Sequence, residues 1–180
     1  MLLPLFTQLD LPHRDVNDSY DYDICSTLLS AISLLLSTSS SAQQQLFHNK
    51  GFLIISKVLL EANAKHLRDS VLDELFGMAK FLLSCPAGFP LLKQLFDHIL
   101  FNPQLWIRAP SEIQIRLYQY LVNDFLSNTN FLAVVRRSST VVELLNAIKY
   151  YYWVVLPRAP STYTVKHLEN RPERLIAFVR

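Results

Sequence analysis

Apolar side chains recur at every third or fourth position in one run after another along this sequence. This is the spacing of one face of an amphipathic α-helix. The chain has only three glycines among its 180 residues, whereas hairpin-rich β-folds need glycine for their turns. The apolar runs cover about residues 20–36, 51–62, 66–83, 89–101, 111–126 and 141–155. The sequence therefore predicts an all-α fold.

The apolar runs are also related to one another by an internal repeat. A shift of about 37 residues superimposes 51–62 on 88–99, with Gly51 on Gly88. A shift of about 42 residues superimposes 71–79 on 113–121, and the longer shift reflects an inserted loop. A unit of about forty residues with paired helices is the period of armadillo and HEAT-like repeats. We therefore predict an α-solenoid.

The domain organisation follows from the same pattern. We interpret residues 1–180 as one helical-repeat segment of a larger protein, with residues 1–19 irregular because two prolines interrupt them. A last amphipathic helix begins near Asn170 and has barely started when the sequence reaches Arg180. A solenoid hides the apolar face of one repeat against the next repeat, and natural ends carry polar caps. The sequence therefore predicts that this end frays or self-associates.

Two helix starts and one anchoring side chain can be assigned in the second half of the chain. Ser111 and Gln114 have the spacing of a capping box, and Thr140 and Glu143 have the same spacing. We expect Thr140→Ala to cost about 1 kcal/mol of stability. Residues 101–110 contain two prolines and are predicted to form a loop. Trp106 is the only large aromatic residue well inside this loop, and we expect it to pack against neighbouring helices.

The sequence contains no recognisable catalytic or ligand-binding motif. A glycine-rich phosphate loop, HExxH, GxSxG and EF-hand spacings are all missing. The five histidines are scattered, and the two cysteines, Cys25 and Cys85, are far apart. Both cysteines lie in apolar surroundings, which predicts buried free thiols rather than a redox pair or a zinc knuckle. We therefore predict that the chain is not an enzyme and has no cofactor and no metal ion.

No run of apolar residues is long enough for a membrane span. The most apolar stretch, 28–36, is short and is interrupted by two serines. The first residues lack the basic region of a signal peptide and contain a proline. These features predict a cytoplasmic protein whose association with membranes is peripheral or depends on other domains.

Two features near the C-terminus are candidate interface residues. Lys149, Tyr150 and Trp153 belong to an aromatic run at the end of a predicted helix. This run either packs between repeats or contacts a partner through its exposed rings. Arg136 and Arg137 precede the Thr140 cap, where they form either a solvated turn or a phosphate-binding pair. Stacking aromatics along a basic groove are missing, which argues against a nucleic-acid partner.

The most specific elements of the sequence lie between residues 100 and 157. They are FNPQLWIRAPSEIQIRLYQYLVNDFL and VVRRSSTVVELLNAIKYYYWVVLP. Both resemble the armadillo-like helical region of BEACH-domain proteins, the family of neurobeachin and the LPS-responsive beige-like anchor protein. Members of this family are very large cytosolic scaffolds of membrane traffic, in which helical repeats accompany lectin-like, BEACH and WD40 domains.

The resemblance implies a non-catalytic segment that binds proteins and acts in vesicle and membrane-protein trafficking. It implies a cytoplasmic location, peripheral on intracellular membranes in the full-length protein. Partners would be other proteins or neighbouring domains of the same chain. The alternative is a purely architectural spacer between flanking domains, with no partner of its own.

Overall fold

The computed structural model describes residues 3–6, 8–10 and 22–135. All regular elements within these ranges are helical, which confirms the predicted all-α class. The α-helices are α1 (Leu3–Phe6), α2 (Ile24–Thr38), α3 (Ser40–His48), α4 (Gly51–Glu61), α5 (Asp69–Ser84), α6 (Phe89–Leu95), α7 (Pro103–Trp106), α8 (Ser111–Tyr120) and α9 (Thr129–Val135). The 3-10 segments are η1 (Ala64–His66) and η2 (Pro86–Gly88), and the π-helical segments are η3 (Phe96–Leu100) and η4 (Leu121–Phe125).

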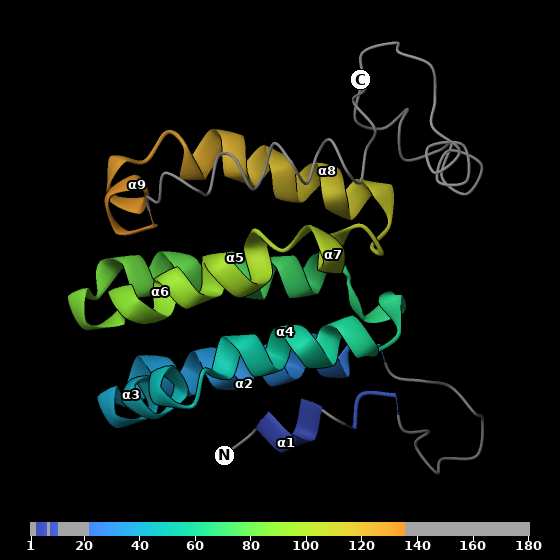
Figure 1. Cartoon of the computed structure of the whole chain (residues 1–180), viewed down its shortest axis with the longest axis horizontal. Helices are drawn as coiled ribbons and strands as arrows, with labels where there is room; N and C mark the ends of the chain where they lie inside the picture. Colours follow the sequence, from blue (N-terminus) through green and yellow to red (C-terminus); the bar gives the residue numbers. More distant parts are fainter. Residues whose placement is uncertain (1–2, 7, 11–21, 136–180) are drawn as a thin grey trace, which may run out of the picture.

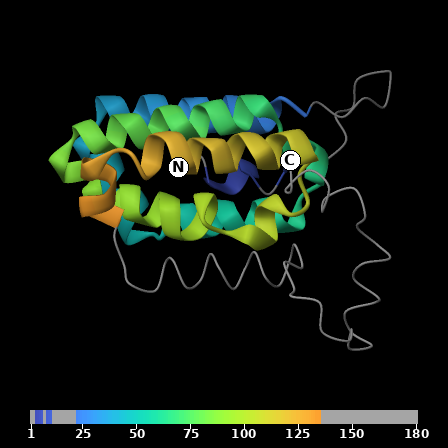
Figure 2. The same ribbon diagram turned by 90° about the horizontal axis from the view of Figure 1, so that it is seen from above.

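The helices are stacked in two layers (Figure 1). In one layer α2 packs on α5 and α5 packs on α8. In the other layer α1 packs on α4, α4 on η3, and α6 on α9. Figure 2 looks along the stack and shows the layers side by side. This arrangement of paired helices is the predicted α-solenoid.

One continuous apolar core fills the space between the layers. Several positions that the 37-residue shift superimposes are buried in both repeats, as the pair Ile55 and Leu92 illustrates with 0% exposure of each side chain. Leu59 and Phe96, which the same shift pairs, are also buried, at 1% and 0%. The apolar periodicity therefore identified the core face of each helix correctly, because the two repeats bury equivalent faces.

Two glycines at equivalent positions of the repeat allow close contacts at helix corners. A Cβ atom on Gly51 would lie 2.7 Å from Cγ of Leu46 and 3.2 Å from its carbonyl oxygen. A Cβ atom on Gly88 would lie 2.9 Å from Cδ2 of Leu82 and 3.1 Å from its carbonyl oxygen. A Cβ atom at either corner would therefore require Leu46 or Leu82 to shift.

Phenylalanine rings from both layers meet toward the end of the stack that carries α9. The ring of Phe96 lies 4.8 Å from that of Phe125 and 5.2 Å from that of Phe101. Phe131 of α9 lies 5.6 Å from Phe96 and 6.0 Å from Phe125. These four residues, the phenylalanine cluster, join η3, η4 and α9 through apolar contact.

The predicted loop 101–110 contains a short helix, α7, and its anchor is confirmed. The Asn102 side chain caps α7 by accepting a hydrogen bond from the amide of Gln104 at 3.1 Å. Pro103 occupies the first turn, where proline is favoured. Trp106 is 1% exposed, and its Nε1 donates to the carbonyl of Ile99 at 2.8 Å. The prediction that Trp106 packs against neighbouring helices is therefore confirmed.

Other local predictions require correction. Ser111 does not cap α8: the helix already includes it, because the Gln114 amide donates to the carbonyl of Pro110. The Gln114 side chain instead donates to the carbonyl of Ala109 at 2.6 Å. Residues 1–19 are not uniformly irregular, since α1 forms and buries Phe6 completely. The proline in α1 lies in the first turn, where it does not remove a helical hydrogen bond.

Candidate functional site

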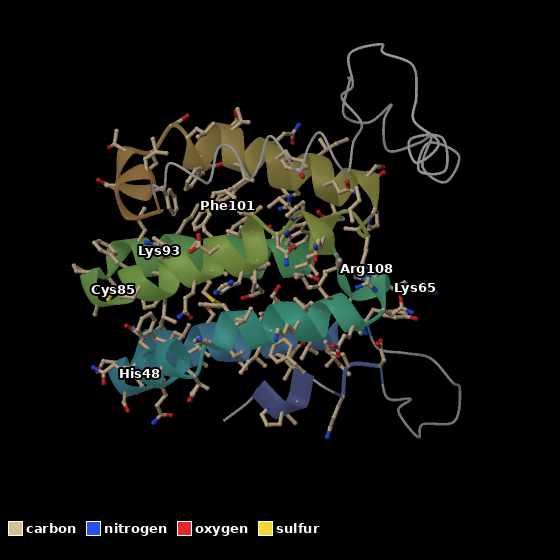
Figure 3. All side chains as sticks on the ribbon, in the orientation of Figure 1. His48, Lys65, Cys85, Lys93, Phe101 and Arg108 are labelled. Atoms are coloured by element: carbon tan, nitrogen blue, oxygen red, sulfur yellow. The ribbon has the colours of Figure 1, made fainter. Side chains whose placement is uncertain are left out.

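A groove of about 490 Å³ opens where the start of α5 meets the loop between α7 and α8. It therefore lies between two successive levels of the solenoid. Leu67 and Ile113 are buried beneath it, whereas most of the other lining residues are exposed. The lining residues are Lys65, Leu67, Arg68, Asp69, Ser70, Pro110, Glu112 and Ile113. Figure 3 labels Lys65 and Arg108 at this edge of the stack.

The basic side of the groove is arranged around Tyr22. The ring centroid of Tyr22 lies 5.4 Å from Nζ of Lys65 and 5.3 Å from Cζ of Arg68. Arg68 also forms an ion pair with Asp23, with Nη1 to Oδ1 at 3.1 Å. Cation–π contacts with one ring hold both basic side chains on the same side of the groove.

The acidic side of the groove is formed by the first turns of α5 and α8, which carry Asp69 and Glu112. Carboxylates are favoured there because the amide ends of helices carry partial positive charge. Arg116 of α8 links the two helices, since its Nη1 lies 2.8 Å from Oδ1 of Asp69 on α5 and its guanidinium also contacts Asp73. The hydrogen bonds that the Arg116 guanidinium donates to Asp69 and Asp73 raise its pKa. The groove thus has charges of both signs on its rim.

Arg108 attaches one wall of the groove to the level below it. Its guanidinium donates to the carbonyl of Ala62 at 2.6 Å, to that of Leu59 at 3.2 Å, and to that of Leu60. These are carbonyls at the C-terminal end of α4, where the helix has no intrahelical donors left for them. A cation is favoured at this end of a helix. Arg108 therefore fixes the loop that leads into α8.

The N-terminal segment is attached to the same edge by polar contacts. Asp10 accepts a hydrogen bond from the amide of Asn63 at 2.9 Å, and its other oxygen lies 3.1 Å from Nε2 of His66. His66 is completely buried, and its ring packs edge-on against Tyr22 at 5.1 Å. These contacts hold Asp10 against η1, although the two are more than fifty positions apart in the sequence. His66 therefore fixes the N-terminal segment around Asp10 against η1.

The described residues offer no constellation for metal binding: within 3–6, 8–10 and 22–135, no group of three or more His, Cys, Asp or Glu residues could hold an ion.

Burial raises the pKa of the Cys25 thiol to about 12, which suppresses its reactive thiolate. Cys85 is only half-buried, so the prediction of two buried thiols is correct for Cys25 alone. None of the helices described is long and apolar enough to cross a membrane.

The groove and the predicted interface are different parts of the chain. Arg136, Arg137, Lys149, Tyr150 and Trp153 lie outside the described residues, as do the Thr140 cap and the helix after Asn170. Sequence reasoning missed the groove because its lining comes from two segments, 65–70 and 110–113, which are about forty residues apart. The one available signal was the similar position of the two acidic first turns within the repeat.

Comparison with known proteins agrees with this architecture. A family model described as "Neurobeachin/BDCP, DUF4704 alpha solenoid region" matches residues 1–175. Proteins described as neurobeachin homologs from Caenorhabditis briggsae and Caenorhabditis elegans are 59% and 58% identical over 173 residues. BEACH domain-containing protein B of Arabidopsis thaliana is 23% identical over 151 residues, which cover 82% of this chain and 6% of that protein. No solved structure matches the chain.

The match to the nematode proteins covers 96% of this chain but only 7% of the length of each relative. The chain thus corresponds to a small part of very long proteins. Its two-layer helical stack, the family match over nearly all of its length and the identity to the nematode relatives lead to one conclusion. The chain belongs to the family of neurobeachin α-solenoid regions.

Proposed function

We propose that this chain is a non-catalytic scaffold segment that binds other proteins within a large BEACH-family protein acting in vesicle and membrane-protein trafficking. The observation that carries the proposal is the groove between the starts of α5 and α8. Solenoids use surfaces that extend across adjacent repeats to bind their partners. In this chain the groove has a buried apolar floor and an exposed charged rim.

The chemistry of the rim favours a polypeptide partner. Two basic residues, Lys65 and Arg68, and two acidic residues, Asp69 and Glu112, all line the groove. A nucleic acid or another polyanion would meet two carboxylates here, and binding such partners depends on clustered positive charge. A peptide segment with side chains of both signs can pair with both sides while it covers the apolar floor.

The proposal can be tested by capturing cytosolic proteins on the 180-residue chain. The double variant Lys65→Glu with Glu112→Lys reverses one charge on each side of the groove and keeps the net charge. The variant Lys57→Glu with Glu61→Lys is a matched control, because it makes the same exchange on exposed positions of α4.

Partners that bind the groove should be depleted about tenfold or more by the first variant, which corresponds to about 1.4 kcal/mol, and retained by the control. Melting curves of both variants check that the fold persists. Equal capture by both variants would exclude the groove as the binding site. If the unmodified chain reproducibly captured nothing, the alternative function as an architectural spacer would be favoured.

A further inference from the structure

Two of the charged residues that line the groove already have a partner of opposite charge within the protein. Asp69 pairs with Arg116, whose Nη1 lies 2.8 Å from its Oδ1. Arg68 pairs with Asp23, again through Nη1 and Oδ1, at 3.1 Å. The field of a charge is largely cancelled when an opposite charge lies next to it. Asp69 and Arg68 therefore have less to gain from the charge of a binding partner.

The other two charged residues of the groove, Glu112 and Lys65, are not paired in this way. The Glu112 side chain is exposed and forms neither an ion pair nor a hydrogen bond with the residues that the structure describes. Lys65 is also exposed, and among the described residues its ammonium contacts only the ring of Tyr22. That contact leaves its positive charge uncompensated. Unpaired charges at the rim of a binding surface attract the opposite charges of a partner and help to select it.

The residues that precede the helices explain why the groove is open at this level. Asp23 precedes α2 and Arg68 precedes α5, and their ion pair joins the two helix starts. The residue that precedes α8 is Pro110, whose side chain has no polar group. It cannot form the equivalent contact with Arg68, so the starts of α5 and α8 are not joined in this way. Pro110 instead presents an exposed apolar surface to the groove.

We propose that the groove selects a peptide segment with a basic and an acidic residue on either side of an apolar residue. The basic residue pairs with Glu112, the acidic residue pairs with Lys65, and the apolar residue packs on Pro110. Asp69 and Arg68 contribute little to the selection, because their charges are already paired. This inference rests on the proposed function and adds to it the residues that determine which peptides bind.

Short random peptides displayed on phage and panned on the 180-residue chain supply the probes, and fluorescence polarisation of the synthetic peptides gives their Kd. Ser70 is a half-buried residue of the groove, so peptides that bind the groove should lose affinity for Ser70→Trp, in which a ring fills the space. A melting curve checks that this variant folds, and Ser70→Leu replaces it if it does not.

Neutralising single charges then separates free from paired residues. Glu112→Gln and Lys65→Gln should each weaken the groove-binding peptides about three- to fivefold, the upper range for an exposed ion pair. Asp69→Asn should change the Kd less than about twofold, because this charge is paired with Arg116. Lys57→Gln, on an exposed position of α4, is the matched control and should have no effect.

Reversing the charge of Glu112 gives the sharpest comparison. Glu112→Lys should weaken groove-binding peptides about tenfold or more, because it places like charges opposite each other. Glutamate in place of the basic residue of the peptide should restore most of the affinity for this variant alone. Groove-binding peptides that tolerate Glu112→Lys or Lys65→Gln, that the glutamate exchange does not rescue, or that Asp69→Asn weakens as much as Glu112→Gln does, would overturn this inference and leave the groove a peptide site. If no panned peptide loses affinity for the Ser70 variants, the proposed function itself fails.

Discussion

Replacing Arg108 by methionine should remove a polar contact that joins two levels of the solenoid. Methionine retains the apolar stem but cannot donate to the carbonyls of Leu59, Leu60 and Ala62. These contacts are only partly buried, so water can reach some of the carbonyls in the variant. We therefore count one charge-assisted hydrogen bond, about 1.5–3 kcal/mol, and the loss of a cation at a helix C-terminus, about 0.3–1 kcal/mol. The expected destabilisation is about 2–4 kcal/mol.

Urea unfolding followed by circular dichroism measures this effect. With a slope of about 2 kcal/mol per M, the unfolding midpoint should fall by about 1–2 M and the slope should stay unchanged. Arg108→Lys should lie between the two proteins, because it retains the charge but loses the planar fork that reaches several acceptors.

Arg116→Met is the matched control, since Arg116 is 41% exposed and pairs with exposed carboxylates. Exposed ion pairs of this kind contribute about 0–1 kcal/mol and weaken further in salt. The effect of Arg108→Met should persist in 1 M salt, because its acceptors are backbone carbonyls. If Arg108→Met destabilises the chain no more than Arg116→Met does, the reasoning about α4 is refuted.

Three further predictions concern burial and packing. Trp106→Ala should lower the free energy of unfolding by about 3–5 kcal/mol in urea titrations, and a loss below about 1 kcal/mol would contradict its role as an anchor. Gly51→Ala should lower the free energy of unfolding by about 1–3 kcal/mol through overpacking, and so lower the melting temperature. Gly77→Ala should raise the free energy of unfolding by about 0.5–1 kcal/mol, because no atom lies within 4 Å of a Cβ there. Since burial raises the pKa of Cys25 from 9.0 to about 12, its neutral thiol stabilises the fold below pH 9, and this contribution disappears as the pH rises toward 12. A thiol reagent at pH 8 should therefore modify Cys85 long before Cys25, and equal rates would count against the burial of Cys25.

The helices of this chain could be predicted from sequence because their signal is local. The run predicted over 66–83 matches α5, and only its start is displaced, because the Asn63 side chain accepts from the Lys65 amide and forms the short segment η1 first. The capping box at Ser111 was wrong because a serine after proline can equally be the first residue of a helix. Residue type at one spacing does not distinguish these two helix starts.

The groove could not be predicted, since its geometry depends on long-range hydrogen bonds whose acceptor and donor groups have no recognisable pattern in the sequence. The acceptors of Arg108 are main-chain carbonyls, which every residue has. The contact between Asp10 and His66 joins positions 56 residues apart, and neither residue belongs to a recognisable motif. Periodicity identifies which face of a helix is buried, but it does not identify the long-range polar contacts that fix one level of the solenoid to the next.

The contacts that join successive levels differ in kind from place to place along the stack, and this gives the solenoid a preferred way to bend. The phenylalanine cluster joins η3, η4 and α9 through apolar surface. Arg108, at the edge that Figure 3 labels, and His66 join other segments through hydrogen bonds. When a hydrogen bond opens, water can replace the lost partner, but separated rings gain no such substitute. We therefore expect a pull along the stack to separate the levels first where hydrogen bonds join them, with the phenylalanine cluster as the hinge.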